Sequence, residues 1–239
     1  MQNQQEFEKR AAQIDEGLEL AVVYEPPPLV NEDTFGLDDA ILRRIVALTL
    51  ARVGVVEPAA LSVLVTDDEG LRSLNRQYRG QDEVTDVLSF PWLDAPLVKG
   101  APDELWPAAS ARETRIVLLD GLDSRQEPLT AGTALGHAEE LEVGIDFPEE
   151  NRHEGEFPIL EESSALNLGD IAISRDAVER QAARANHSAA WEFAYLLAHG
   201  VLHLVGYDDQ TDAGYHTMVV HQEAVLADAG ITRRRNTNN

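Results

Sequence analysis

A long apolar helix that ends at a glycine constrains the fold of this chain more than any other feature of its sequence. Apolar residues recur at helical spacing up to residue 205, and the last turns contain Leu196, Leu197, Val201, Leu202 and Leu204. Gly206 is expected to end the helix, because glycine adopts a positive φ at low cost and lets the chain turn back. We therefore predict helical structure over about 175–205, with an interruption near 186–188 and a tight turn after it.

Two histidines occupy this helix one turn apart. The i and i+4 spacing of His199 and His203 places both imidazoles on one helical face, where they can bind the same ion. Asp208 and Asp209 follow directly after Gly206, so one carboxylate can complete a three-ligand site. Three protein ligands and an open position for water are typical of a catalytic metal site. The alternative is that both histidines are ordinary surface or core residues.

The other histidines are weaker ligand candidates, and cysteine is absent. These histidines are His137, His153, His187, His216 and His221. His216 is the best of them because it follows the turn closely. Without cysteine the chain cannot form thiolate clusters, disulfides or a thiol nucleophile, so any metal must be held by His, Asp or Glu.

Gly200 separates this segment from the zinc metalloproteases. Their H-E-x-x-H motif places a glutamate directly after the first histidine, where it acts as general base. Gly200 occupies that position here and has no side chain that could accept a proton. Peptide hydrolysis by that mechanism is therefore disfavoured.

The remaining patterns predict an α+β fold with a mixed β-sheet packed with helices. Strands are expected over 18–24, 61–65, 85–90 and 168–174, and further helices over 38–53, 66–78 and 211–229. Thr66 and Glu69 match a capping box at the start of the 66–78 helix, and Gly230 is placed to cap the last helix. The candidate metal site would lie on the long helix and the turn that follows it.

The stretch from Trp92 to Asn167 differs in composition from the rest of the chain. It holds 17 acidic and 5 basic residues and 6 of the 11 prolines, and so carries half of the formal net charge of −24. We interpret residues 92–167 as an acidic insertion within a single domain over 1–239. The short apolar runs 116–119 and 141–145 could extend the sheet.

The strong acidity counts against a simple nucleic-acid-binding module, because it repels RNA and anionic membranes. It is compatible with an enzyme that meets phosphates in one cleft. No apolar run is long enough for a membrane helix, and the first residues lack the pattern of a signal peptide. We therefore expect a cytoplasmic protein with no membrane partner, while the oligomeric state stays open.

Three separated motifs follow one another along the chain: LNRQYRGQDEVTDVLSFP at 74–91, LGDIAIS at 168–174 and HGVLHLVGYDD at 199–209. Together they resemble the YbeY family of bacterial endoribonucleases, which act in ribosomal RNA maturation and carry the metal motif H-G-x-L-H-L-x-G-Y-D-H. The resemblance covers residues 18–91 and 166–229. It implies a single-strand-specific, metal-dependent endoribonuclease acting on a ribosomal RNA precursor. It also implies one divalent metal ion, expected to be zinc, and ribosomal proteins as further partners.

One ligand position departs from the family motif. The third ligand is usually histidine, and the matching residue here is Asp209. Because a carboxylate is a competent zinc ligand, the resemblance implies the set His199, His203 and Asp209. The anionic ligand would make bound water less acidic, and harder ions such as Mn²⁺ would be better tolerated.

The resemblance also implies a catalytic or substrate-binding role for Arg79, in the YRG turn. A cation beside the metal would stabilise the negative charge that gathers on phosphate oxygens in the transition state. A surface salt bridge is the alternative for a single loop arginine. Arg72 and Arg76 precede Arg79 at near-helical spacing and would give a locally positive strip, so we expect weak RNA binding that falls with added salt.

Several nearby residues have both a site-related and a structural interpretation. Asp86, Ser89 and Asp170 are further candidates; Asp86 and Asp170 stand near the starts of their strands, where each could orient a ligand histidine or cap a turn. Asp208 could orient ligands instead of binding metal. Tyr207 could stack on a base or pack in the core.

Two other functions stay open from the residues alone. The first is a metallohydrolase for another substrate, such as a small phosphoester or a peptide. The second is a non-catalytic ribosome-assembly factor with a structural metal. Gly200 disfavours a peptide substrate and Arg79 favours a phosphate, whereas an assembly factor would keep its function when a ligand histidine is changed.

Overall fold

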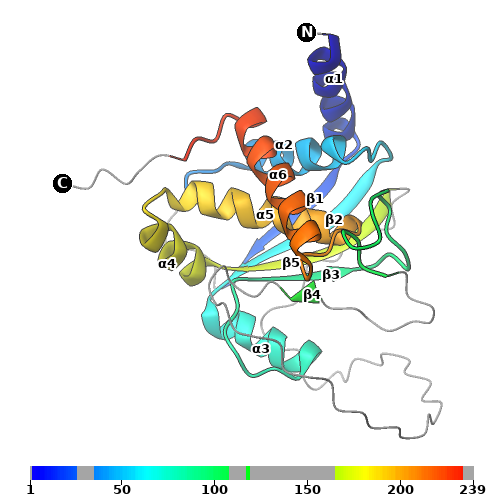
Figure 1. Ribbon diagram of the computed structural model, residues 1–239. Helices are drawn as coiled ribbons and strands as arrows, with labels where there is room; N and C mark the ends of the chain where they lie inside the picture. The colour runs from blue at the N-terminus through cyan, green and yellow to red at the C-terminus, as the bar shows by residue number, and fades with distance from the viewer. Residues whose placement is uncertain (1, 26–34, 108–116, 119–164, 234–239) are drawn as a thin grey trace, which may run out of the picture.

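A mixed β-sheet organises the part of the chain that the structure describes. The structure is a computed structural model and describes residues 2–25, 35–107, 117–118 and 165–233 (Figure 1). The strands are β1 Glu19–Tyr24, β2 Ala59–Thr66, β3 Val87–Pro91, β4 Val117–Leu118 and β5 Leu166–Ser174. They lie in the order β1-β2-β5-β3-β4. β1, β2 and β5 are parallel and β3 is antiparallel to both neighbours, which confirms the predicted mixed sheet.

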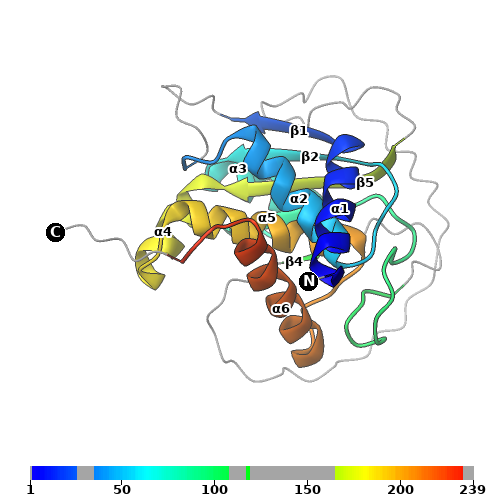
Figure 2. The ribbon, with the colours of Figure 1, turned by 90° about the horizontal axis from the view of Figure 1, so that it is seen from above.

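Helices cover both faces of this sheet. Their bounds are α1 Gln2–Glu16, α2 Asp39–Arg52, α3 Asp68–Arg79, α4 Arg175–Ala185, α5 Ala189–Val205 and α6 Asp212–Asp228. Figures 1 and 2 show α2, α5 and α6 on one face, with α1 packed on α2, and α3 on the opposite face. The α+β class is therefore confirmed. Within the described ranges, no helix combines the length and apolarity needed to cross a bilayer.

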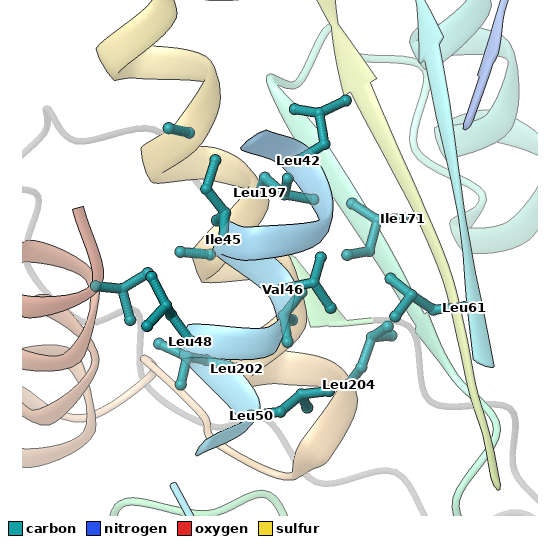
Figure 3. Packing of buried hydrophobic residues seen from close by; sticks show 14 of the residues in the cluster. Leu42, Ile45, Val46, Leu48, Leu50, Leu61, Ile171, Leu197, Leu202 and Leu204 are labelled. Carbon is teal, nitrogen blue, oxygen red and sulfur yellow. The ribbon is translucent and has the colours of Figure 1, made fainter. Parts of the chain in front are cut away.

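Alternation along the strands divides the core into two clusters. Leu61 and Val63 of β2 face the large cluster formed with α2 and α5, whereas Leu64 faces a smaller cluster beneath α3. Figure 3 shows Leu197 of α5 and Ile171 of β5 within the large cluster. The period of two in a strand thus places each helix on its own face of the sheet.

Helix α5 is buried from Trp191 to Val205, as expected for a helix that is apolar on every side. The predicted interruption before it is confirmed, since Asn186 adopts the left-handed conformation with φ 56° and caps α4. The predicted end is confirmed as well, because Gly206 has φ +127°. A Cβ at Gly206 would lie 2.6 Å from Cβ of Pro96, so the turn also depends on the absence of a side chain.

Three local expectations need correction or completion. The capping box at Thr66 is wrong: Asp67 caps α3 by accepting a hydrogen bond from the Gly70 N–H, because Thr66 still pairs with β5 as the last residue of β2. The sequence patterns do not predict α1, whose residues are mostly polar. Within the predicted insertion, Val117–Leu118 of the apolar run 116–119 form β4, while the run 141–145 lies outside the described residues.

Close packing of α5 on β5 generates a prediction about stability. A Cβ at Gly200 would lie 2.9 Å from both Cδ1 and Cγ2 of Ile171. Gly200→Ala is therefore expected to lower the free energy of unfolding by about 1–3 kcal/mol, as overpacking does in filled cores. In an Ile171→Ala background the same change is expected to be neutral or stabilising, because alanine favours helix over glycine by about 1 kcal/mol.

Urea denaturation of the wild type, both single variants and the double variant measures this coupling. The m-value serves as a control for two-state unfolding. Equal destabilisation by Gly200→Ala in both backgrounds would contradict the proposed clash with Ile171.

Candidate metal centre

Three of the predicted site residues come together at the end of α5. The Nε2 atoms of His199 and His203 lie 2.9 Å apart. A carboxylate oxygen of Asp209 lies 3.6 Å from Nε2 of His199, and the other lies 3.9 Å from Nε2 of His203. One donor atom from each residue falls within a 4.8 Å group, and no other His, Asp or Glu group of this kind occurs in the described ranges.

These separations fit one small divalent ion. Ligand atoms bound to a tetrahedral zinc ion at about 2.0–2.2 Å lie roughly 3.4 Å from one another. The observed separations of 2.9, 3.6 and 3.9 Å lie on both sides of this value. The donor set of two imidazoles and one carboxylate is also one that zinc accepts.

The orientation of the His203 ring supports the same interpretation. Its Nδ1 lies 2.8 Å from the backbone carbonyl oxygen of Tyr207. Because a carbonyl only accepts hydrogen bonds, Nδ1 must carry the proton, and neutral His203 then presents the lone pair of Nε2 to the group. Metal-ligating histidines are commonly oriented in this way by a hydrogen bond from their other nitrogen.

Burial sets the charge of the group. Burial and the neighbouring His199 lower the pKa of His203 to about 3, so its imidazole is neutral at physiological pH. Burial alone would raise the pKa of Asp209, but the adjacent imidazoles of His199 and His203 lower it overall. His203 and Asp209 are therefore both held in the deprotonated form that metal binding requires.

A segment between Pro96 and Trp106 holds the turn that carries Asp209. The indole N–H of Trp106 donates to the carbonyl of His203, and its backbone N–H donates to the carbonyl of Gly206, both at 3.0 Å. The Asp208 N–H donates to the carbonyl of Glu104 at 2.9 Å. This support was missed in the sequence, because hydrogen bonds to distant backbone carbonyls leave no periodic signal.

Arg79 lies close enough to the group to affect its electrostatics. It is the last residue of α3 and precedes Gly80, which caps the helix with φ 68°. Its guanidinium nitrogens are buried, and its positive charge contributes to the lowered pKa of His203. The structure thus brings the predicted catalytic arginine toward the three candidate ligands.

The predicted positive strip on α3 is not confirmed. The guanidinium of Arg72 donates two hydrogen bonds to Asp82, at 2.8 and 3.0 Å, and lies 3.7 Å from Glu69. Arg76 lies 3.7 Å from the same aspartate. Asp82 follows α3 and returns beside it, so local acidic residues offset the charge that helical spacing suggested.

The two strand carboxylates differ in their relation to the site. Asp86 is buried, which raises its pKa, although the hydrogen bond from Gln181 and the charge of His199 act in the opposite direction. It thus lies within electrostatic reach of one candidate ligand. Asp170 lies on the α3 face of the sheet, where its carboxylate accepts hydrogen bonds from Ser62 and the indole of Trp92. It does not orient either histidine.

The remaining nearby candidates have structural environments. Asp208 accepts a hydrogen bond from the Gln210 N–H at 3.2 Å and shapes the turn. Tyr207 is buried with its ring 5.3 Å from that of His221, which favours packing over base stacking. The Ser89 hydroxyl is buried and has no hydrogen-bond partner among the described residues.

The other histidines stand apart from the group. His216 contacts the ring of Tyr215 on α6, and His187 pairs with Glu192 at 2.9 Å. Neither belongs to the three-residue group. His137 and His153 lie outside the described residues.

Comparisons with known proteins agree with the geometry. The family model described as "Endoribonuclease YbeY" matches residues 33–230. An endoribonuclease YbeY of Moorella thermoacetica is 34% identical over 192 residues, which cover 80% of this chain and 86% of that protein. Those of Desulforamulus reducens and Pelotomaculum thermopropionicum are each 32% identical, over 81% and 87% of this chain and 87% and 99% of their own lengths. The chain described here belongs to the YbeY family.

Proposed function

We propose that this chain is a metal-dependent endoribonuclease that cleaves single-stranded RNA during ribosomal RNA maturation. The observation that carries the proposal is the convergence of His199, His203 and Asp209 with the charge of Arg79. Family membership supports RNA as the substrate, since the curated relatives are named endoribonucleases. Ribosomal proteins would provide the docking that a chain of net charge −24 lacks.

We further propose that one divalent ion, zinc in preference to harder ions, is held by the two Nε2 atoms and the Asp209 carboxylate. When bound, such an ion polarises a phosphoryl oxygen and lowers the pKa of water. The chain's own residues position the ligands and stabilise the charge of the substrate. The Tyr207 carbonyl fixes the ring of His203, Trp106 fixes the helix end, and Arg79 stabilises charge on the phosphate oxygens.

Packing around Gly200 argues against the peptidase alternative. A metalloprotease of the H-E-x-x-H type has a glutamate at this position. Even a Cβ there would meet Ile171 at 2.9 Å, so the fold has no space for a longer acidic side chain. The assembly-factor alternative is tested by the variants below, because it requires neither cleavage nor Arg79.

Removal of the third ligand tests the metal site. Asp209→Ala is expected to weaken zinc binding on the order of 100-fold or more, because loss of a direct ligand costs at least as much as loss of its supporting hydrogen bonds. Metal content after dialysis measures the effect, with Asp208→Ala as the matched control in the same turn. Full occupancy in Asp209→Ala would end the assignment of Asp209 as a ligand.

Removal of the guanidinium tests the role of Arg79. Arg79→Ala is expected to keep metal and fold but to lower kcat roughly 10²- to 10³-fold, as loss of a transition-state donor does. Arg76→Ala, an exposed arginine of the same helix, serves as the control. Cleavage is measured on labelled single-stranded RNA. His203→Ala is measured in parallel, because cleavage that persists in this variant reveals contaminating nucleases. Unchanged kcat in Arg79→Ala would refute the catalytic role.

A further inference from the structure

Trp92 combines high exposure with a fixed orientation. Its side chain is 68% exposed, whereas Trp106 and Trp191 are buried. Its backbone N–H donates to the carbonyl of Leu168 at 3.1 Å, and its indole N–H donates to a carboxylate oxygen of Asp170 at 3.2 Å. The indole is therefore held in one orientation while much of its surface meets solvent.

A polar pair, one residue buried and the other half-buried, maintains this orientation. Ser62 of β2 is fully buried and stands opposite Asp170 of β5 in the register of the parallel strands. The Ser62 hydroxyl donates to the other carboxylate oxygen of Asp170. A buried hydroxyl beside a half-buried carboxylate costs free energy that two apolar residues would not. Among the described residues, the Asp170 carboxylate of this pair also accepts the hydrogen bond from the indole of Trp92.

Tyr78 brings a second aromatic ring to the same region. It is 38% exposed, and its ring packs edge-on against Phe90 with centroids 5.3 Å apart. Burial raises the pKa of Tyr78, and the charge of Asp170 adds to the shift, so the phenol lies near the carboxylate that holds Trp92. Arg79 follows Tyr78 directly on α3.

The chain links this aromatic region to the candidate metal centre on both sides. On one side, Arg79 extends the helix of Tyr78 toward His203. On the other, the segment after Trp92 reaches α5, where the Leu97 N–H donates to the carbonyl of Val205 at 2.9 Å. The aromatic region and the candidate centre are thus joined through Arg79 and through the segment after Trp92, which makes this region a candidate for contact with RNA bound at the centre.

We propose that Trp92, with Tyr78 beside it, is a stacking site for an unpaired base of the RNA substrate. The inference rests on the proposed function, which supplies the class of ligand. Unpaired bases stack on aromatic side chains with little regard to sequence, and a base inside a duplex cannot. Because Arg72 and Arg76 are offset by Asp82, stacking would supply binding that charge does not. A single rigid ring held by a hydrogen bond favours a base over a protein partner.

Binding of short single-stranded RNA with a single abasic position tests the proposal. A series of labelled oligomers carries the abasic position at successive places, and anisotropy gives the affinity of the metal-loaded full chain. The oligomers are checked on denaturing gels to be intact. In the wild type, one position is expected to weaken binding roughly 5- to 100-fold when its base is removed. Trp92→Leu is expected to bind the intact oligomer as weakly as the wild type binds the sensitive abasic oligomer. Its affinity is expected not to change further when that base is removed.

Controls separate stacking from general hydrophobic contact. Trp92→Phe is expected to restore part of the abasic discrimination, because it restores a ring. Val220→Ala, a change at a residue 64% exposed on α6, is expected to bind like the wild type. RNA is also expected to quench the fluorescence of the wild type and not that of Trp92→Leu, because the other two tryptophans are buried.

The outcome is independent of whether the chain cleaves RNA. Abasic discrimination that depends on Trp92 would support the stacking site even if no cleavage were detected. Normal cleavage with discrimination unchanged in Trp92→Leu would overturn the stacking site and leave the proposed function intact. Unchanged discrimination together with weakened binding of a ribosomal protein would assign the surface to a protein partner instead.

Discussion

Helix α5 has no solvent-facing side, and its burial between the sheet, α2 and α6 determines where the two histidines lie. Gly200 permits this position, because the helix approaches Ile171 too closely for any side chain there. Both imidazoles are thereby carried out of water, and burial lowers the pKa of His203 so that its ring stays neutral. A packing constraint in the core thus positions the lone pairs that a metal ion would use.

The turn after α5 is the second feature that the candidate metal centre requires. Gly206 reverses the chain, and Asp209 returns beside the helix from which it came. Backbone hydrogen bonds from Trp106 and to Glu104 hold this reversal in place. The segment that supplies them lies within the stretch interpreted as an acidic insertion, so composition alone does not show the structural role of its first residues.

Local periodicity predicted most elements, and local ambiguity explains the errors. Thr66 and Asp67 both precede α3, and both are residue types suited to capping a helix. Only the pairing of Thr66 with Ser174 on β5 decides that Asp67 is the cap. The polar helix α1 buries little beyond Ala11 and Ile14, so its sequence has no strong apolar stripe. At the site, spacing suggested the two histidines, and the family resemblance implied Asp209 and Arg79; the structure brings the first three together, and their roles remain proposals. The partners of Asp170 and Trp106 could not be predicted, because they are distant in sequence.

The central claim is that one ion held at the end of α5 makes this chain an endoribonuclease. Its most direct test is a single zinc titration of chelator-stripped protein, in which bound metal and the rate of RNA cleavage are measured in the same samples. The account predicts that both rise together and saturate at about one ion per chain, and that His203→Ala shows neither. Full cleavage by the stripped protein, or cleavage that does not follow occupancy, would contradict it.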